Sequence, residues 1–416
     1  MRKLSVLIAP AAAAGLIAAV LPATAANAAK YVPPELFGQH IAGVAGGVPA
    51  TLAGGLGGSV RIWDSGLSWR DLQPNAGAPN LDPLRTAVAQ IEGRFGPGVE
   101  ILYTVGNTPT WAATKPNDPK ALYGASTNSH PALGAYVDFV KAVAGVPGID
   151  AIQIWNEANL ADFYNGTPTQ MARLTVAAGK ALKGMGWRGT VVAASTTVRS
   201  KGPVNAWGKQ YGKAMKKAKA WKYVNAVSAH FYPPATKGPN ERVKYIKKTK
   251  AYYKRWGAKK KPLWDTEMNF GDQRSYMKVK RYYDGDQAAA YVARAYLDSL
   301  RYGVARVFWY GWNIQVLGLD MTSRDGTLKA GGQAYLTAQD WLAGARWYGC
   351  KTKSKVTTCK IRSRAGAKQQ IRFTTSKSKT IRVPKGQSTM TRLDRTVTPV
   401  TKGQKVKITT YPVLFG

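Results

Sequence analysis

The chain has 416 residues, of which 60 are Lys or Arg and 22 are Asp or Glu, so its formal net charge at pH 7 is +38. This length exceeds the usual size of one hydrophobic core, so we expect a large domain and a smaller one. The two cysteines, Cys350 and Cys359, are close in sequence and do not cluster with the three histidines, which argues against a metal site. In an oxidising compartment we expect them to form a local disulfide across a hairpin.

The first 28 residues have the order of a secretory signal peptide. A charged start, Met1-Arg2-Lys3, is followed by an apolar run and then by small residues, with cleavage expected after Ala28. A membrane anchor is the alternative, but prolines and many alanines make this run a poor spanning helix, and no later segment is apolar enough to span a bilayer. We therefore expect a secreted, extracellular protein that is soluble or associated with the cell wall.

The positive charge favours polyanionic partners such as nucleic acid, teichoic acids, acidic polysaccharide or anionic lipid. The lysines are spread over many segments, which favours solvated faces that adapt the surface or adhere to an anionic cell wall. We do not predict specific recognition of nucleic acid, because the chain has no basic-aromatic RNA-binding signature and no zinc-finger spacing.

Eight apolar, strand-like runs follow, at intervals long enough for a helix. They span residues 36–40, 60–63, 99–105, 149–155, 190–194, 224–230, 263–266 and 305–310. Helical patterns lie between them at residues 83–95, 132–144, 169–185 and 287–301. This alternation predicts an α/β fold with a parallel sheet, and eight strands are the number that closes a (β/α)8 TIM barrel. A doubly wound open sheet has the same spacing, but no Gly-rich dinucleotide loop follows the first run.

The pattern changes after a last helical segment at residues 332–342, which ends near Gly344. Short alternating strands are expected at residues 356–361, 370–374, 380–383 and 406–410, with turn signals at 384–386 and 402–404. The predicted division is therefore a signal peptide (1–28), a barrel (31–343) and a small C-terminal all-β domain (344–416).

Two glutamates stand at the ends of two separate strand-like runs. Asn156 and Glu157 follow the fourth run, and Glu267 directly follows the seventh run. The carboxyl ends of barrel strands carry the active site of this fold, so we expect the two side chains to lie there. Two carboxylates at strand ends are what cleavage of a glycosidic bond requires, and Glu157 is the candidate general acid.

Polar residues at other strand ends are candidates for contacts within the same site. Arg61 and Tyr232 can donate hydrogen bonds that keep Glu267 ionised, and Asn156 can hold a sugar hydroxyl. His230 lies two residues before Tyr232, so both face the cleft if the chain stays extended there; a structural histidine is the alternative.

Asp64 also stands at a strand end and is a candidate for a substrate subsite. Among the tryptophans, Trp309 at the end of the eighth run is the preferred surface for stacking a sugar ring. Trp111 is a further candidate, for which a role in the core is the alternative. No metal triad or phosphate loop stands out, so we expect neither a metal nor a cofactor.

With these residues in view, the chain resembles the clan A glycoside hydrolases, whose two glutamates follow barrel strands four and seven. It is most similar to family 39-like members, which include bacterial endoglycosidases and β-xylosidases, in residues 60–64 with Trp69, in residues 108–112 and in residues 230–233. The tail, at residues 383–384, 403 and 412–414, looks like the β-sandwich that packs beside such barrels. It departs from that pattern in its many cations, which include Arg372, Lys377, Lys379, Arg382 and Lys385.

The resemblance implies a retaining enzyme in which Glu267 is the nucleophile and Glu157 the acid and base. We therefore expect a secreted, monomeric glycoside hydrolase that cleaves β-glycosidic bonds in a poly- or oligosaccharide by double displacement. Two alternatives remain open at this point. One is a barrel protein that has lost activity and binds the cell wall, and the other is a polyanion-binding protein.

Overall fold

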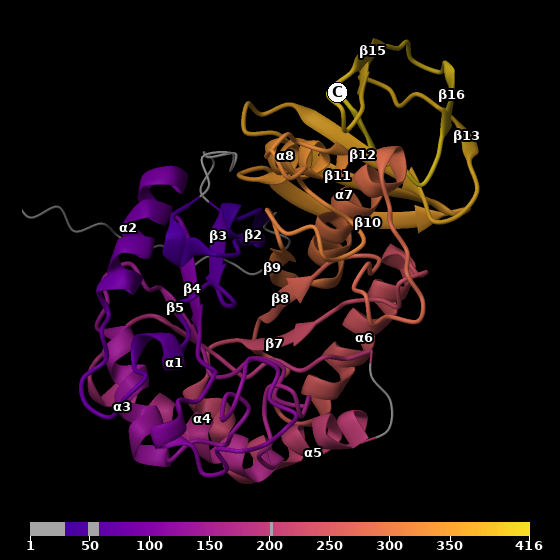
Figure 1. The fold of residues 1–416 in the computed structure, drawn as a ribbon. Helices are drawn as coiled ribbons and strands as arrows, with labels where there is room; N and C mark the ends of the chain where they lie inside the picture. Colours follow the sequence, from indigo (N-terminus) through magenta and orange to yellow (C-terminus); the bar gives the residue numbers. More distant parts are fainter. Residues whose placement is uncertain (1–29, 49–57, 200–202) are drawn as a thin grey trace, which may run out of the picture.

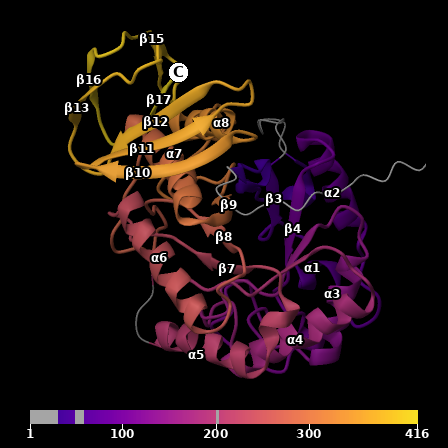
Figure 2. The same ribbon diagram turned by 180° about the vertical axis from the view of Figure 1, so that it is seen from behind.

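The structure is a computed structural model that describes residues 30–48, 58–199 and 203–416. The predicted signal peptide lies outside the described residues. The described chain forms a barrel surrounded by helices and an all-β part that packs against one side of it (Figures 1 and 2). None of the helices in these ranges is long and apolar enough to cross a membrane.

The barrel is built on eight strands that pair in parallel. They are β2 (Phe37–His40), β3 (Ser59–Ile62), β4 (Glu100–Thr104), β5 (Ala151–Gln153), β6 (Thr190–Val192), β7 (Val227–His230), β8 (Leu263–Met268) and β9 (Val304–Tyr310). Their order is β6-β5-β4-β3-β2-β9-β8-β7, and a parallel bridge between Val192 and Ala226 joins the two outer strands. Each predicted strand-like run overlaps one of these strands, so the predicted TIM barrel is confirmed.

Helices alternate with the strands and cover the outside of the barrel. They are the short α1 (Trp69–Leu72), α2 (Asp82–Phe95), α3 (Leu133–Ala144), α4 (Pro168–Gly184), α5 (Pro203–Lys217), α6 (Pro239–Arg255), α7 (Gly285–Tyr302) and α8 (Ala330–Leu342). Four 3-10 turns accompany them: η1 (Pro34–Leu36), η2 (Val44–Gly46), η3 (Thr110–Ala112) and η4 (Ala220–Tyr223). Helices α5 and α6 fall in lysine-rich stretches that the sequence indicated only as solvated faces. The inner side of α6 nevertheless buries Ile246 and Tyr253.

The barrel interior is arranged in layers, because alternate residues of a strand point to the same face. An apolar layer crosses the barrel and consists of Leu102, Ala151, Val192, Ala226, Trp264 and Phe308. A second, polar set of residues lies two positions further along four of these segments: Thr104, Gln153, Ser228 and Thr266. Gln153 forms hydrogen bonds of 2.9–3.0 Å with the other three. This polar layer lies nearer the carboxyl ends of the strands and supports the site described below.

The C-terminal part contains a seven-stranded sheet and a two-stranded one. The larger sheet has the order β1 (Lys30–Tyr31), β10 (Arg346–Lys353), β11 (Val356–Arg362), β12 (Lys368–Thr374), β17 (Val413–Phe415), β14 (Thr389–Thr391) and β15 (Val397–Pro399). The smaller pairs β13 (Lys379–Arg382) with β16 (Lys405–Ile408). Each of the four predicted strands overlaps one of these, and the architecture agrees with a β-sandwich. Strand β1 joins this sheet from the start of the described chain, so the division at residue 344 stays a prediction.

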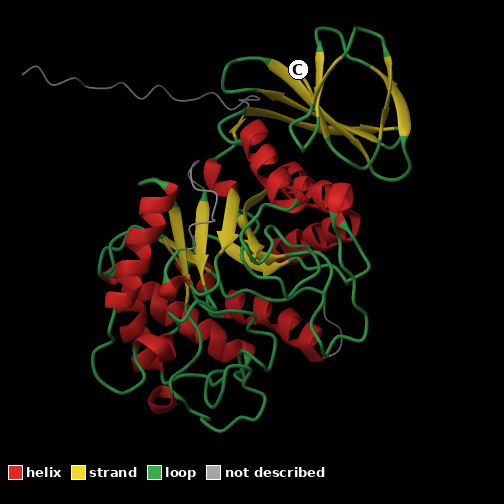
Figure 3. Cartoon of the chain, turned by 45° about the horizontal axis from the view of Figure 1, so that its top comes forward, coloured by secondary structure: helices red, strands yellow, loops and turns green. Residues whose placement is uncertain are grey.

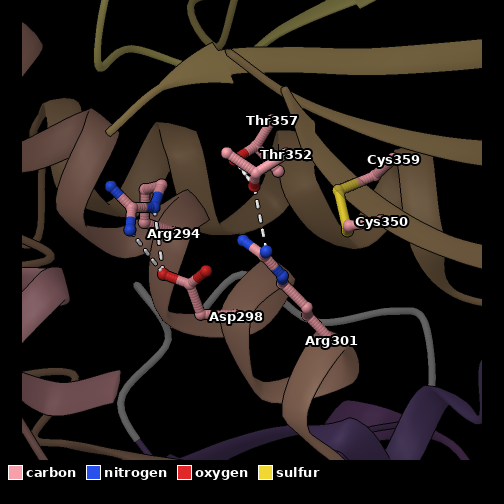
Figure 4. The surroundings of a disulfide bond; sticks show 7 residues. All are labelled: Arg294, Asp298, Arg301, Cys350, Thr352, Thr357 and Cys359. Carbon is pink, nitrogen blue, oxygen red and sulfur yellow. Dashed lines mark hydrogen bonds and ion pairs between the residues drawn. A yellow bond between two sulfur atoms is a disulfide. The ribbon is translucent and has the colours of Figure 1, made fainter. Parts of the chain in front are cut away.

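Helices lie between the barrel strands and the C-terminal sheet (Figure 3), and helix α7 contacts β10 of that sheet. The predicted disulfide between Cys350 and Cys359 is present and links β10 to β11. Close to it, Arg301 of α7 donates a hydrogen bond of 2.9 Å to Thr352 of β10 (Figure 4). On the same helix, Arg294 lies over the ring of Phe373 of β12, at 4.7 Å.

Candidate active site

Glu157 stands just beyond the carboxyl end of β5 in a left-handed backbone conformation, with φ of 36°. Residues other than glycine seldom adopt this conformation, and when they do it is often at a functional site. A hydrogen bond of 2.9 Å from its backbone N–H to Oγ of Ser195 holds it there, and Ser195 itself follows β6. The turn therefore fixes the direction in which the Glu157 carboxyl points.

Arg61 of β3 connects the two halves of the site from inside the barrel, where its side chain is fully buried. Its Nη1 donates to Oε1 of Glu267 at 2.7 Å, and its Nη2 donates to Oδ1 of Asn156 at 2.7 Å. Its Nε donates to Thr104 of the polar layer at 3.1 Å. A buried guanidinium needs such partners, and here they orient both a carboxylate and an amide.

Glu267 lies near the end of β8, where the register against both neighbouring strands shifts. The hydroxyl of Tyr232 donates to its Oε2 at 3.0 Å, in addition to the contact from Arg61. The sequence predicted both donors. Burial raises the pKa of Glu267, and the Arg61 charge acts in the opposite direction.

His230 lies between the two glutamates. Its Nδ1 is 3.0 Å from Oε1 of Glu157 and 3.4 Å from Oε2 of Glu267. Burial lowers the pKa of His230 to about 3, so the ring is neutral at pH 7. A neutral ring carries one proton, and its position decides whether His230 can donate to the carboxylates.

The polar layer determines that position. The Nε2 of Gln153 donates to Oγ1 of Thr266 at 3.0 Å, while the Oε1 of the same amide faces Arg61. The hydroxyl hydrogen of Thr266 is then free to point at Nε2 of His230, 3.1 Å away. We therefore assign the proton of His230 to Nδ1, from which it is donated toward Glu157 and Glu267.

Glu157 has the properties of a general acid at neutral pH. Burial raises its pKa to about 7, although the positive charges of Arg199 and Arg61 act in the opposite direction. A carboxyl with this pKa is partly protonated at pH 7 and can give its proton to a leaving group.

Glu157, His230 and Glu267 each offer one metal-ligand atom, and these three atoms lie within 4.8 Å of one another. Such a set could hold a divalent ion. However, the oxygens of Glu267 already accept from Arg61 and Tyr232, and the nitrogen of His230 that faces the carboxylates, Nδ1, carries the ring proton, because Nε2 accepts from Thr266. These contacts take up positions that a metal ion would need, so the three side chains do not fit a metal site in this arrangement.

The two glutamates open onto a cavity of about 480 Å³ at the carboxyl ends of the strands. Asn156, Asp64 and Tyr232 line it as well, and Arg61 and His230 are buried beneath it. Asp64 accepts hydrogen bonds from Tyr123 at 2.6 Å and from Tyr310 at 2.9 Å. The structure thus brings together seven of the predicted site residues: Glu157, Glu267, Asn156, Arg61, Asp64, His230 and Tyr232.

The two predicted stacking tryptophans lie elsewhere, and these two expectations are corrected. Trp309 is completely buried and packs against Phe270, because Phe308 points into the barrel and its neighbour must point toward the surrounding helices. Trp111 is 36% exposed, but it donates to the carbonyl of Gln73 at 3.0 Å and is not part of the cavity lining.

Several further residues that line the cavity were not predicted from the sequence. Tyr310 could have been found, because it lies two residues after the inward-facing Phe308. Tyr123, Arg199 and Arg274 come from loops, where no periodic pattern indicates the direction of a side chain. Arg274 forms an ion pair of 2.6 Å with Asp272, and Arg199 lies over the ring of Tyr232 at 5.6 Å.

Comparison with known proteins gives a likeness in structure only. No protein-family model matches the chain, and no curated protein matches it in sequence. A family 39 glycoside hydrolase from Bacteroides cellulosilyticus WH2 superposes with a TM-score of 0.68 at 16% identity, over 92% of this chain and 81% of that one.

Two further solved structures agree with this likeness. A family 39 β-xylosidase from Caulobacter crescentus gives a TM-score of 0.66 at 13% identity, over 94% of this chain and 97% of that one. An endo-β-1,6-glucanase gives 0.61 at 15% identity, over 92% of each chain. At these identities the likeness establishes the fold, and the resemblance inferred from the sequence is confirmed at that level: the chain has the fold of the clan A glycoside hydrolases.

Proposed function

We propose that the protein is a retaining glycoside hydrolase that cleaves β-glycosidic bonds in a poly- or oligosaccharide. The observation that carries this proposal is the spacing of Glu157 and Glu267. One carboxylate oxygen of each lies within 4.8 Å of the other. Retaining enzymes hold the carboxyl groups about 5–5.5 Å apart, whereas inverting enzymes hold them about 6.5–9.5 Å apart to leave room for a water.

In the first step, the ionised carboxylate of Glu267 attacks the anomeric carbon while the glycosidic C–O bond breaks. Glu157 gives its proton to the departing oxygen, so the products are a free sugar hydroxyl and a glycosyl ester on Glu267. Arg61 and Tyr232, both in contact with Glu267, orient it for this attack. Asn156, held by Arg61, is placed to hydrogen-bond a substrate hydroxyl.

In the second step, Glu157 removes a proton from water as the water oxygen attacks the same carbon and releases Glu267. The change of role follows from the coupling between the two groups. The charge of Glu157 raises the pKa of Glu267, and a charge–charge interaction acts equally on both partners. Esterification removes the charge of Glu267 and so lowers the pKa of Glu157, which turns the acid into a base. In both steps, Nδ1–H of His230 donates toward the carboxyl groups of Glu157 and Glu267.

The direct test uses a 2-deoxy-2-fluoro glycoside with a good leaving group, which slows the second step more than the first. We expect the sugar to become covalently attached, and mass spectrometry of peptides to locate it on Glu267. Label on another residue, or inversion at the anomeric carbon in the product, would refute the proposed mechanism.

We also propose that the protein is exported through its N-terminal segment and associates with an anionic cell wall. A disulfide is typical of oxidising compartments, and the net charge of +38 supports attraction to polyanions. A barrel that binds the wall without activity is less well supported, since such a protein has no need for the contacts that Glu267 makes with Arg61 and Tyr232.

A further inference from the structure

The C-terminal sheet carries a hollow of about 630 Å³ that lies apart from the catalytic cavity. Strands β10, β11 and β12 and the segment between β13 and β14 form it. Helix α7 lies between these strands and the barrel (Figure 1). We call it the basic hollow, because five cationic side chains line it: Lys351, Lys360, Arg362, Lys368 and Lys385.

Among the described residues, no carboxylate lines the hollow. None of the five cations forms an ion pair within the part of the chain that the structure describes. Residues 344–416 contain eighteen Lys and Arg residues and one acidic residue, Asp394, which pairs with Arg392. The positive potential of the hollow is therefore uncompensated.

The strand register places like charges directly opposite one another. Arg362 of β11 pairs with Arg346 of β10 on one side and with Lys368 of β12 on the other. Like charges in this position destabilise a sheet. The Nε of Arg362 also has no hydrogen-bond partner among the described residues. An anion bound in the hollow would relieve both costs, since it offsets the repulsion and accepts from the guanidinium.

The cations are spaced along an extended surface. Lys360 and Arg362 are two residues apart on β11, so both face the hollow at a separation of roughly 6.6–6.8 Å, whereas the alternate residues Cys359 and Ile361 are buried. The strands β10 and β12 continue this array at intervals of about 4.8 Å. Such an array suits a polymer with an anionic group on successive units more than a single small anion.

Uncharged groups in the hollow match a sugar chain. The ring of Tyr348 is 52% exposed and can lie against the apolar face of a sugar. The side-chain amides of Gln370 and Gln387 lie among the cations. Gln387 is 8% exposed, and its Oε1 has no hydrogen-bond partner among the described residues. Single-stranded nucleic acid is less well matched, because its bases stack on successive rings and Tyr348 is the one aromatic residue in the lining.

We propose that the basic hollow is a binding site for an acidic glycan, a sugar chain that carries a carboxylate or a phosphate on repeated units. The site is independent of the catalytic cavity. It would hold the protein on such a polymer whether or not the same polymer is the substrate.

The test compares two variants of the full-length protein that lose the same amount of charge. The first replaces the hollow lysines (Lys351→Gln, Lys360→Gln, Lys368→Gln and Lys385→Gln). The control replaces exposed lysines of the same domain that do not line the hollow (Lys377→Gln, Lys402→Gln, Lys405→Gln and Lys407→Gln). Binding is measured at fixed ionic strength to polygalacturonate, to dextran phosphate and to neutral dextran.

We expect the hollow variant to lose roughly tenfold or more in affinity for at least one acidic polymer, and the control variant to lose less than about threefold. Neither variant should bind dextran. The preferred polymer shows whether carboxylate or phosphate is recognised. Equal losses in both variants would overturn the proposal in favour of diffuse charge, and so would unchanged binding. Tighter binding to a single-stranded oligonucleotide of equal charge would also overturn it.

A single substitution guards against misfolding of the multiple variant. Arg362→Gln removes the charge that lies between Arg346 of β10 and Lys368 of β12. We therefore expect the melting temperature without polymer to rise, and the affinity for the acidic polymer to fall. A variant that binds as the wild type does would contradict the site. Because hydrolysis is not measured, this outcome does not depend on the catalytic proposal.

Discussion

Arg61 and Glu267 form an ion pair of 2.7 Å inside the barrel, although their strands are separated in the sheet by two others. The side chains are 0% and 10% exposed. Removing one partner of a buried pair leaves a charge without compensation, which costs about 3–5 kcal/mol. We expect Arg61→Met to lower the free energy of unfolding by about this amount, and a second substitution, Glu267→Gln, to restore part of it.

Denaturant unfolding of the two single variants and the double variant measures the coupling between these residues. Arg85→Met is the matched control, because Arg85 pairs with Asp82 at 2.6 Å on the exposed surface. Its effect should be at most about 1 kcal/mol. Additive effects of the Arg61 and Glu267 substitutions would show that the buried pair does not stabilise the fold.

The proposed role of Glu157 as acid and base predicts a dependence on the leaving group. Glu157→Ala should reduce glycosylation by about 10²–10⁴-fold with leaving groups of high pKa, and far less with a dinitrophenyl glycoside, which departs without protonation. Deglycosylation still lacks its base, and azide should restore turnover as a small nucleophile. Pre-steady-state kinetics with both substrates separates the steps. Equal losses on both, with no effect of azide, would assign Glu157 a structural role.

The raised pKa of Glu157 predicts how activity depends on pH. The acid must be protonated in the first step, so kcat/KM should fall as pH rises through about 7. With a dinitrophenyl glycoside this alkaline limb should be much weaker. A limb of equal steepness for both substrates would place the titrating group elsewhere.

The same shift predicts the pH dependence of stability. Between the ordinary value of 4.5 and about 7, the folded state binds more protons at Glu157 than the unfolded state, so its contribution to stability falls as pH rises. The Glu157→Gln variant lacks this loss. Its stability relative to the wild type should therefore increase across this range by about 3 kcal/mol and level off above it. Parallel unfolding curves of the two proteins from pH 4.5 to 7 would contradict the shift.

Thr266 is expected to act through His230 as a positioning residue. Thr266→Val removes the hydroxyl that donates to Nε2 of His230 and should free the ring to move its proton, with kcat falling roughly tenfold or more. Thr266→Ser keeps the hydroxyl and should keep the activity. Nitrogen NMR of His230 reports the tautomer directly. If the valine variant retained the Nδ1–H form, Gln153 and Thr266 would have no part in setting it.

The strands and both glutamates could be predicted because each depends on local sequence. A short apolar run bounded by turn residues indicates a strand, and a barrel places the residues that follow at one common face. The prediction that Trp309 stacks against a sugar ring was wrong, because a position at a strand end does not give the direction of a side chain. The alternation of side chains along the strand gives that direction, once Phe308 is known to face inward.

Other features could not be predicted because they depend on contacts between distant segments. The proton position on His230 depends on Gln153 and Thr266, which look like ordinary strand residues. The like charges opposite Arg362 become visible only when the register of three strands is known. Strand β1 has two residues and no pattern of its own, and only its pairing with β10 makes it a strand.

The pairing of β1 with β10 has a consequence for biogenesis. Synthesis proceeds from the amino end, so Lys30 and Tyr31 leave the ribosome early, and their partners Trp347 and Arg346 follow only after the whole barrel has emerged. The larger sheet cannot be completed on a chain that is still being synthesised. Its edge must close late, when the barrel has already brought these distant segments of the chain together.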